Sequence, residues 1–144
     1  MGCDIHLYIE ILTENGWELY SHPSVKQDYE LFAKMAGVRN YTEIKPISLP
    51  KGLPEDISYV VRRASEDWGS DGHSHSWLCS DEIRQLREWY DGWRYDPDGK
   101  PLWCQKTLHH HALHCYCEGG YFDDVEEDRH PWIKAARFVF WFDN

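Results

Sequence analysis

The fold of this chain is decided by the stretch AARFVFWF at residues 135–142. The stretch is almost entirely apolar and is rich in residues that favour β-strands. A strand with one face in water alternates apolar and polar residues, whereas a strand covered on both faces is apolar throughout. Residues 135–142 are therefore predicted to form a central strand of a sheet.

A second strand is predicted near the other end of the chain. Residues 3–12 alternate in polarity, and their polar face carries Asp4, His6, Tyr8 and Glu10. The dipeptide Asn15-Gly16 is a strong hairpin signal, so residues 17–20 should return antiparallel to this strand. We expect a small, mainly antiparallel sheet that includes both chain ends.

Two helices are predicted between these strands from their capping residues. Ser24 and Gln27 resemble a capping box for a first helix, which Gly37 ends. Ser58 is suited to cap a second helix, which Gly69 ends. Between the two helices, prolines rule out regular structure over most of residues 41–54, where we expect a long ordered loop.

A third helix is predicted to follow Ser80 and to stop before the turn at residues 96–99. Residues 102–117 are ambiguous and add a fourth helix in one interpretation. The pattern predicts the α+β class, with three or four helices and long ordered loops. A length of 144 residues suits one domain, which we expect to span residues 1–144.

Composition argues against several classes of protein. The chain has 25 Asp and Glu against 15 Lys and Arg, so we expect no binding to bulk nucleic acid, which requires clustered basic groups. The 5 cysteines are an odd number without a secretion signal, which predicts reduced thiols. Because no long apolar run is present, we expect a cytoplasmic protein with no membrane contact.

The stretch HSHSW at residues 73–77 is the main candidate for chemistry. It lies in an aperiodic segment, residues 67–77, that we interpret as a loop. Its two histidines have the i, i+2 spacing that also relates Asp4 to His6, and imidazole with carboxylate suits Zn, Mn or Fe. We therefore expect a divalent metal bound by Asp4, His6, His73 and His75.

Two other interpretations fit the same residues. In one, His6 hydrogen-bonds to Asp4, and His73 and His75 hold an irregular loop by bonding to backbone carbonyls. In the other, these residues line a ligand pocket that binds no metal.

A second cluster, at residues 109–117, contains three consecutive histidines and the sequence Cys115-Tyr116-Cys117. On a helix, His110 and His114 share one face at the i, i+4 spacing that lets two imidazoles reach one ion. The cluster either contributes a ligand to the first site or is a partly exposed helix with small core thiols.

Several segments resemble an uncharacterised family of bacteriophage and prophage proteins. They are MGCDIH at residues 1–6, AGVRNY at 36–41, KGLP at 51–54, the segment 68–77, and the ending FWFDN at 140–144. The similarity spans nearly the whole chain. It implies a phage-encoded protein of the host cytoplasm and brings no established activity with it.

A local similarity to calcineurin-like metallophosphoesterases is also present. Asp4-x-His6, then Arg39-Asn40, then the GHSH of residues 72–75 match in order the D-x-H, G-N-H and G-H-x-H blocks of that family. The resemblance implies that Asp4, His6, Asn40, His73 and His75 are metal ligands. The middle block lacks its catalytic His and the G-D block is missing, so we interpret the similarity as convergent ligand spacing.

The metal site leads to the first functional hypothesis, a metal-dependent hydrolase of a phosphate ester or nucleotide. The metal would lower the pKa of a bound water, and Asp71 or Glu10 would act as the base. Arg39 or Arg62 would hold the phosphate.

The second hypothesis is a non-enzymatic phage binding module that acts in counter-defence. It would sequester a host nucleotide signal or block a host protein, so its partner is either a small phosphate-containing ligand or a protein. Stacking surfaces and polar contacts for this role would come from Asn40, Tyr41, Arg62, Trp68 and Trp77.

Overall fold

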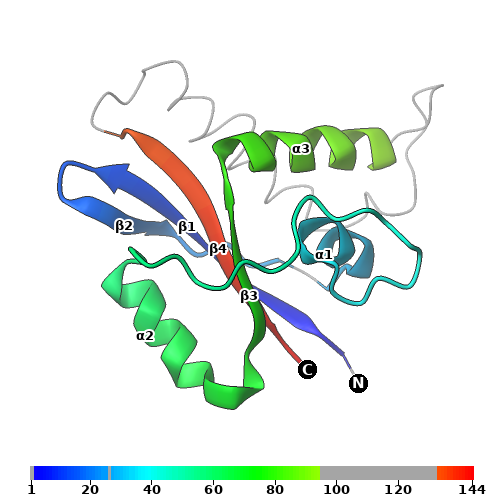
Figure 1. Ribbon diagram of the computed structural model, residues 1–144, viewed down its shortest axis with the longest axis horizontal. Helices are drawn as coiled ribbons and strands as arrows, with labels where there is room; N and C mark the ends of the chain where they lie inside the picture. Colours follow the sequence, from blue (N-terminus) through cyan, green and yellow to red (C-terminus); the bar gives the residue numbers. More distant parts are fainter. Residues whose placement is uncertain (1, 26, 95–132) are drawn as a thin grey trace.

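The computed structural model describes residues 2–25, 27–94 and 133–144. Its centre is a four-stranded antiparallel sheet with the strand order β2-β1-β4-β3 (Figure 1). The strands are β1 (Asp4–Thr13), β2 (Gly16–Ser21), β3 (His73–Cys79) and β4 (Ala135–Asp143). The predicted α+β class, with a sheet that includes both chain ends, is confirmed.

Three helices cover the two faces of the sheet in the described part of the chain. They are α1 (Tyr29–Ala36), α2 (Tyr59–Trp68) and α3 (Ser80–Arg94). Helices α1 and α3 lie on one face and α2 lies on the other (Figure 1). Each face has its own core, the larger under α1 and α3 and the smaller under α2.

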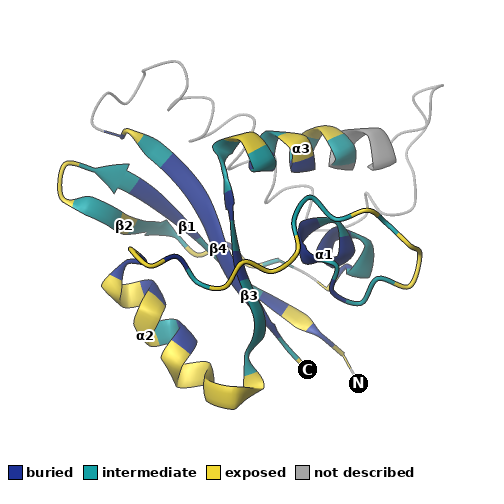
Figure 2. Cartoon of the chain, viewed as in Figure 1, coloured by how far each residue is buried: buried dark blue, intermediate teal, exposed yellow. Residues whose placement is uncertain are grey.

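The predicted central strand is confirmed. Strand β4 pairs with β1 on one side and with β3 on the other, and residues 138–142 are each at most 1% exposed (Figure 2). Phe138, Phe140 and Phe142 belong to the core under α1 and α3. Val139 and Trp141 belong to the core under α2. The lack of polar alternation in the sequence reflects this double burial.

Turn and cap residues place the elements around β4 largely as predicted. The β1–β2 hairpin closes where Thr13 pairs with Gly16, whose φ is 97°. Helix α1 ends at Gly37, which has a left-handed conformation. The predicted capping box of Ser24 and Gln27 is wrong, because the Asp28 carboxylate accepts the Leu31 amide and the helix begins after it.

The stretch HSHSW is part of strand β3, so its interpretation as a loop is wrong. Ser76, Trp77 and Leu78 pair with β4, which supplies the hydrogen bonds that an isolated aperiodic segment lacks. The outer edge of β3 is partly covered, because the Gly52 amide donates to the His75 carbonyl at 2.8 Å. Pairing with residues 60 or more positions away in the sequence therefore overrides the local turn signals.

The ambiguous segment at residues 102–117, the cluster at residues 109–117 and the turn at residues 96–99 lie outside the described residues. None of the helices in the described ranges has the length and apolar composition needed to cross a bilayer.

Candidate functional site

A β-bulge in β3 separates the two histidines of the HSHSW stretch. His73 lies opposite Phe142 and Ser76 lies opposite Phe140, so β3 has one extra residue here, and Ser74 has a φ of 55°. The His73 ring is 6.2 Å from the Phe142 ring, whereas the His75 ring is 5.8 Å from the Trp141 ring. Because consecutive residues of β4 point to opposite faces, the two imidazoles also lie on opposite faces of the sheet.

His6 is held by an aspartate that the sequence analysis did not single out. Its Nε2 lies 2.8 Å from Oδ2 of Asp143, and its ring lies 4.2 Å from that of Trp68. Asp4, the expected partner, is exposed and accepts from Gln27 Nε2 at 3.4 Å. The pairing of β1 with β4 sets residue 143 opposite residue 4, a register that was not predicted from the sequence.

The structure does not bring the four predicted metal ligands to one point. His6 and His75 flank Trp141 on the α2 face, while His73 lies on the other face. In residues 2–25, 27–94 and 133–144, no group of three or more His, Cys, Asp or Glu is placed to hold a metal ion. An ion needs its ligand atoms about 2 Å away, so this arrangement does not fit the expected four-ligand site. Metal binding by this chain stays a prediction.

Arg39 and His73 meet at the side chain of Asn144. Arg39 Nη2 donates to Asn144 Oδ1 at 3.1 Å, and His73 Nε2 lies 3.2 Å from the same oxygen. Arg39 Nη1 donates to the Tyr41 hydroxyl at 3.1 Å, and the guanidinium carbon lies 5.6 Å from the Tyr29 ring centre. Of these residues, Arg39, Tyr41 and His73 were predicted as site residues from the sequence. Asn144, which follows β4, and Tyr29, which looks like an ordinary apolar helix position, were not.

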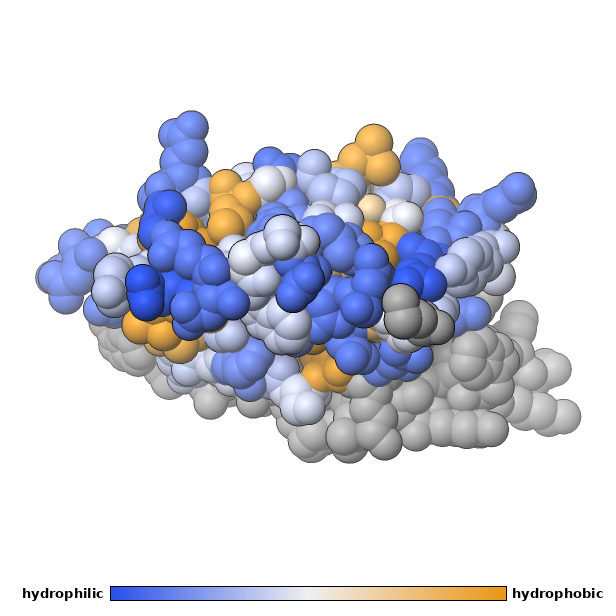
Figure 3. Space-filling view, turned by 90° about the horizontal axis from the view of Figure 1, so that it is seen from below, coloured by the Kyte–Doolittle hydropathy of each residue, from blue (hydrophilic) through white to orange (hydrophobic). Residues whose placement is uncertain are grey.

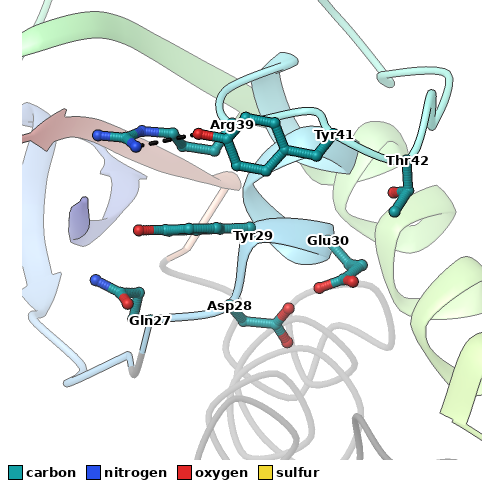
Figure 4. Close-up of a pocket in the computed structure, with 7 residues that line it drawn as sticks. All are labelled: Gln27, Asp28, Tyr29, Glu30, Arg39, Tyr41 and Thr42. Carbon is teal, nitrogen blue, oxygen red and sulfur yellow. Dashed lines mark hydrogen bonds between the residues drawn. The ribbon is translucent and has the colours of Figure 1, made fainter. Parts of the chain in front are cut away.

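Arg39, Tyr41 and Tyr29 form one end of a pocket of about 240 Å³ between the start of α1 and the loop after it (Figure 4). In this view the Tyr29 ring separates the Arg39 guanidinium from two carboxyl groups at the start of α1. The rings of Tyr29 and Tyr41 are 6.0 Å apart and meet edge to face. The pocket is lined by Gln27, Asp28, Tyr29, Glu30, Arg39, Tyr41 and Thr42.

The two carboxyl groups belong to Asp28, the residue that caps α1, and to Glu30 in its first turn. Asp28 is only 7% exposed, and its Oδ1 accepts the Leu31 amide at 3.3 Å. Burial raises the pKa of Asp28 from 3.8 to about 6, although the hydrogen bond from Leu31 opposes the shift. The charge of Glu30 raises this pKa further.

Two other predicted site residues take part in structural contacts. The Asn40 side chain accepts the Ile44 amide at 2.8 Å and donates to the Ile44 carbonyl at 2.6 Å, which closes the loop after α1. Glu10 is fully buried and accepts from Arg137 Nε and from the Ser58 amide, both at 2.8 Å. Glu10 lies four residues along β1 from His6, which is about 13 Å in a strand.

The remaining predicted residues lie away from the pocket. Asp71 is exposed in the short 3-10 helix η1 (Gly69–Asp71). Arg62 is exposed on α2 and donates to the Glu55 carbonyl at 3.4 Å. Trp68 covers His6, and Trp77 packs in the core under α2 with Lys51 Nζ 4.0 Å from its ring centre. None of these side chains lines the pocket at α1.

Searches with this chain gave no matching family model, no matching curated protein and no matching solved structure. Its function must therefore be inferred from the geometry of its own side chains.

Proposed function

We propose that this protein is a non-enzymatic binding module for a small ligand that carries both a planar ring and a phosphate group, that is, a nucleotide. The observation that carries the proposal is the placement of Arg39, which is hydrogen-bonded to Tyr41 and Asn144 above the Tyr29 ring at the mouth of the pocket. With the resemblance to phage proteins, sequestration of a host nucleotide signal is the role that we propose.

Arg39 is the group that would hold the phosphate. Its backbone has a φ of 52°, which costs free energy for a residue other than glycine and fixes the direction in which the side chain leaves the loop. Tyr41 and Asn144 each take a hydrogen bond from one terminal nitrogen. A guanidinium carries five N–H donors, so capacity for a phosphate oxygen remains. The arginine is therefore preorganised for an anion.

The two tyrosines would hold the planar ring. Tyr41 is 69% exposed, which is unusual for a large aromatic side chain whose hydroxyl is already engaged by Arg39. The edge-to-face arrangement of Tyr41 on Tyr29 leaves ring faces on which a base can stack, and stacking of this kind contributes about 1–3 kcal/mol per base. A pocket of about 240 Å³ suits a base, with the phosphate at its Arg39 end.

The chemistry of the lining supports binding and not hydrolysis. The seven described lining residues include no imidazole and no thiol. Asp28 caps α1 with one oxygen, and both carboxyl groups lie across the Tyr29 ring from Arg39, so neither is arranged to activate a water beside the arginine. Recognition of a nucleotide needs none of these catalytic groups.

Calorimetric titration of the full, untagged chain with adenosine monophosphate tests the proposal. We expect saturable binding, and we expect Arg39→Gln and Tyr41→Ala each to weaken it about 10- to 100-fold, since each removes a charged hydrogen bond or a stacking surface. Tyr59→Ala is the matched control, because Tyr59 is 75% exposed on α2 and should not affect binding.

After the protein and the nucleotide are incubated with Zn²⁺ or Mn²⁺, chromatography should recover the nucleotide intact. If the wild-type chain releases phosphate and His6→Ala does not, the proposal is overturned and a metal-dependent hydrolase is favoured. Failure of the wild-type chain to bind any of the common nucleoside monophosphates would also overturn it.

A further inference from the structure

We infer that Arg39 and His73 together form the phosphate subsite, and that the side-chain oxygen of Asn144 occupies this subsite in the present structure. The inference rests on the proposed function, because it assigns a second contact to the same phosphate. It follows from the convergence of two donors, from distant segments of the chain, on one acceptor. Arg39 Nη2 and His73 Nε2 both lie within 3.2 Å of Asn144 Oδ1.

Both of these nitrogens are hydrogen-bond donors. The oxygen of a carboxamide only accepts, so His73 Nε2 must carry a hydrogen. The other ring nitrogen, Nδ1, lies 3.0 Å from the Ser74 hydroxyl, which donates to it when the ring is neutral. Arg39 and His73 therefore direct two N–H groups at a single oxygen. This arrangement suits a phosphate oxygen, because N–H groups bond to a charged acceptor more strongly than to a neutral amide.

The backbone holds both donors through conformations that cost free energy. Among the described residues other than glycine, positive φ angles occur at Arg39, Glu43 and Ser74. The first of these carries one donor, and the last adjoins His73, which carries the other. Residues held in the left-handed region cluster at ligand-binding sites, where the strain fixes the direction of a side chain. The loop after α1 and the bulge of β3 thus each orient one donor.

Asn144 is the partner that a ligand would replace. It is exposed and follows Asp143, the last residue of β4 that pairs with β1, so its side chain can turn away without breaking the sheet. The Tyr41 hydroxyl would keep its hydrogen bond from Arg39 Nη1 and hold the guanidinium at the mouth of the pocket. Because a phosphate oxygen carries more negative charge than an amide oxygen, the exchange would strengthen both hydrogen bonds.

The surroundings of this oxygen are compatible with an anion. Asp143, the acidic residue next to Asn144 in the sequence, is engaged on the α2 face, where its Oδ2 lies 2.8 Å from His6 Nε2. The side of the molecule that carries both chain ends is mainly hydrophilic over its described residues (Figure 3). A phosphate between Arg39 and His73 would therefore stay in contact with water, while the base extends into the pocket.

Calorimetric titrations of the full, untagged chain with adenosine monophosphate and with adenosine test the subsite. Asn144→Ala should bind the monophosphate at least about 5-fold more tightly than the wild type, because no side-chain oxygen competes for the two donors. Adenosine, which lacks the phosphate, should bind both proteins equally. Asn144→Asp should bind the monophosphate at least about 5-fold more weakly, because its carboxylate pairs with Arg39 and repels the phosphate.

His73 is tested in the Asn144→Ala background, where an effect on the phosphate cannot pass through Asn144. There His73→Leu should weaken binding of adenosine monophosphate about 10-fold, because it removes an N–H donor to a charged oxygen. His73→Gln keeps an N–H donor, so its affinity should lie within about 3-fold of the parent. Neither change should alter the binding of adenosine.

The matched control is Asn15→Ala, which removes an exposed carboxamide from the turn between β1 and β2 and should leave both affinities unchanged. Melting curves of all variants establish that they are folded. Equal or weaker binding of the monophosphate by Asn144→Ala, or an unchanged affinity after His73→Leu, overturns the subsite and leaves nucleotide binding in place. Absence of binding by both the wild type and Asn144→Ala overturns the proposed function and the subsite together.

Discussion

Among single residues, the buried carboxyl group of Asp28 makes the stability of the folded chain depend on pH. The side chain supplies the N-cap hydrogen bond of α1, yet burial raises its pKa from 3.8 to about 6. At pH values between 3.8 and about 6, the Asp28 carboxyl group is mostly protonated in the folded chain and mostly ionised in the unfolded chain. The contribution of Asp28 to stability is therefore greatest at low pH and is lost as the pH rises from about 4 to about 6.

Asp28→Asn should remove this pH dependence. Asparagine keeps an oxygen for the Leu31 amide and carries no charge, so we expect the free energy of unfolding at pH 7 to increase by at most about 3 kcal/mol. At pH 4 the variant and the wild type should be equally stable. Urea unfolding at the two pH values measures the difference, and a gain of the same size at both would contradict the assignment.

At the scale of elements, the bulge in β3 determines which face of the sheet each histidine occupies. Ser74 takes a left-handed conformation, and its hydroxyl lies 3.0 Å from His73 Nδ1. The extra residue shifts the alternation, so that His73 lies beside Phe142 while His75 lies beside Trp141. A strand without the bulge would place both imidazoles on one face.

Substitutions of Ser74 should distinguish backbone strain from the loss of its hydroxyl. Ser74→Val places a β-branched residue at a φ of 55°, and we expect a loss of about 1–3 kcal/mol. Ser74→Gly loses the same hydroxyl but adopts this conformation freely, so its stability should stay within about 1 kcal/mol of the wild type. Thermal unfolding of both proteins provides the comparison, and equal losses would argue against a left-handed Ser74.

At the scale of the whole molecule, Arg137 connects three segments that are distant in the sequence. Its side chain is 6% exposed, with Nη2 2.7 Å from Glu10 on β1 and Nη1 2.9 Å from Asp56 before α2. Its guanidinium also lies 3.8 Å from the ring centre of Trp17 on β2. The Glu10 side chain is fully buried, whereas that of Asp56 is 66% exposed, so the two carboxylates should contribute unequally.

Glu10→Gln should destabilise the chain by about 3–5 kcal/mol, because it removes the buried partner of a buried charge. Asp56→Asn, which removes the exposed partner of the same arginine, should cost less than about 1 kcal/mol. Chemical denaturation of the two variants measures this contrast. Similar losses would mean that Arg137 is less buried in solution than in this structure.

Some residues could be assigned correctly from the local sequence, whereas others could not. Gly37, Gly69 and the Asn15-Gly16 turn could be interpreted correctly, because caps and turns depend on neighbours a few positions away. The candidate site was only partly predictable. Arg39 and Tyr41 were named, but Asn144, which accepts from Arg39, is 105 positions away in the sequence, and no local pattern relates the two.

The central strand follows from the sequence alone, because a stretch as apolar as residues 135–142 is stable only when both of its faces are covered. The alternating first strand and its hairpin follow from the sequence too, since strand period and turn chemistry are local properties. By contrast, the strand conformation of HSHSW and the divergence of its histidines depend on tertiary contacts. A shift of one residue in register moves a side chain to the other face, and the register is set by pairing with β4. The pairing of β1 with β4 brings Asp143 to His6, and the residue after β4, Asn144, accepts a hydrogen bond from Arg39, so the polar end of the sheet is formed only when both chain ends are in place.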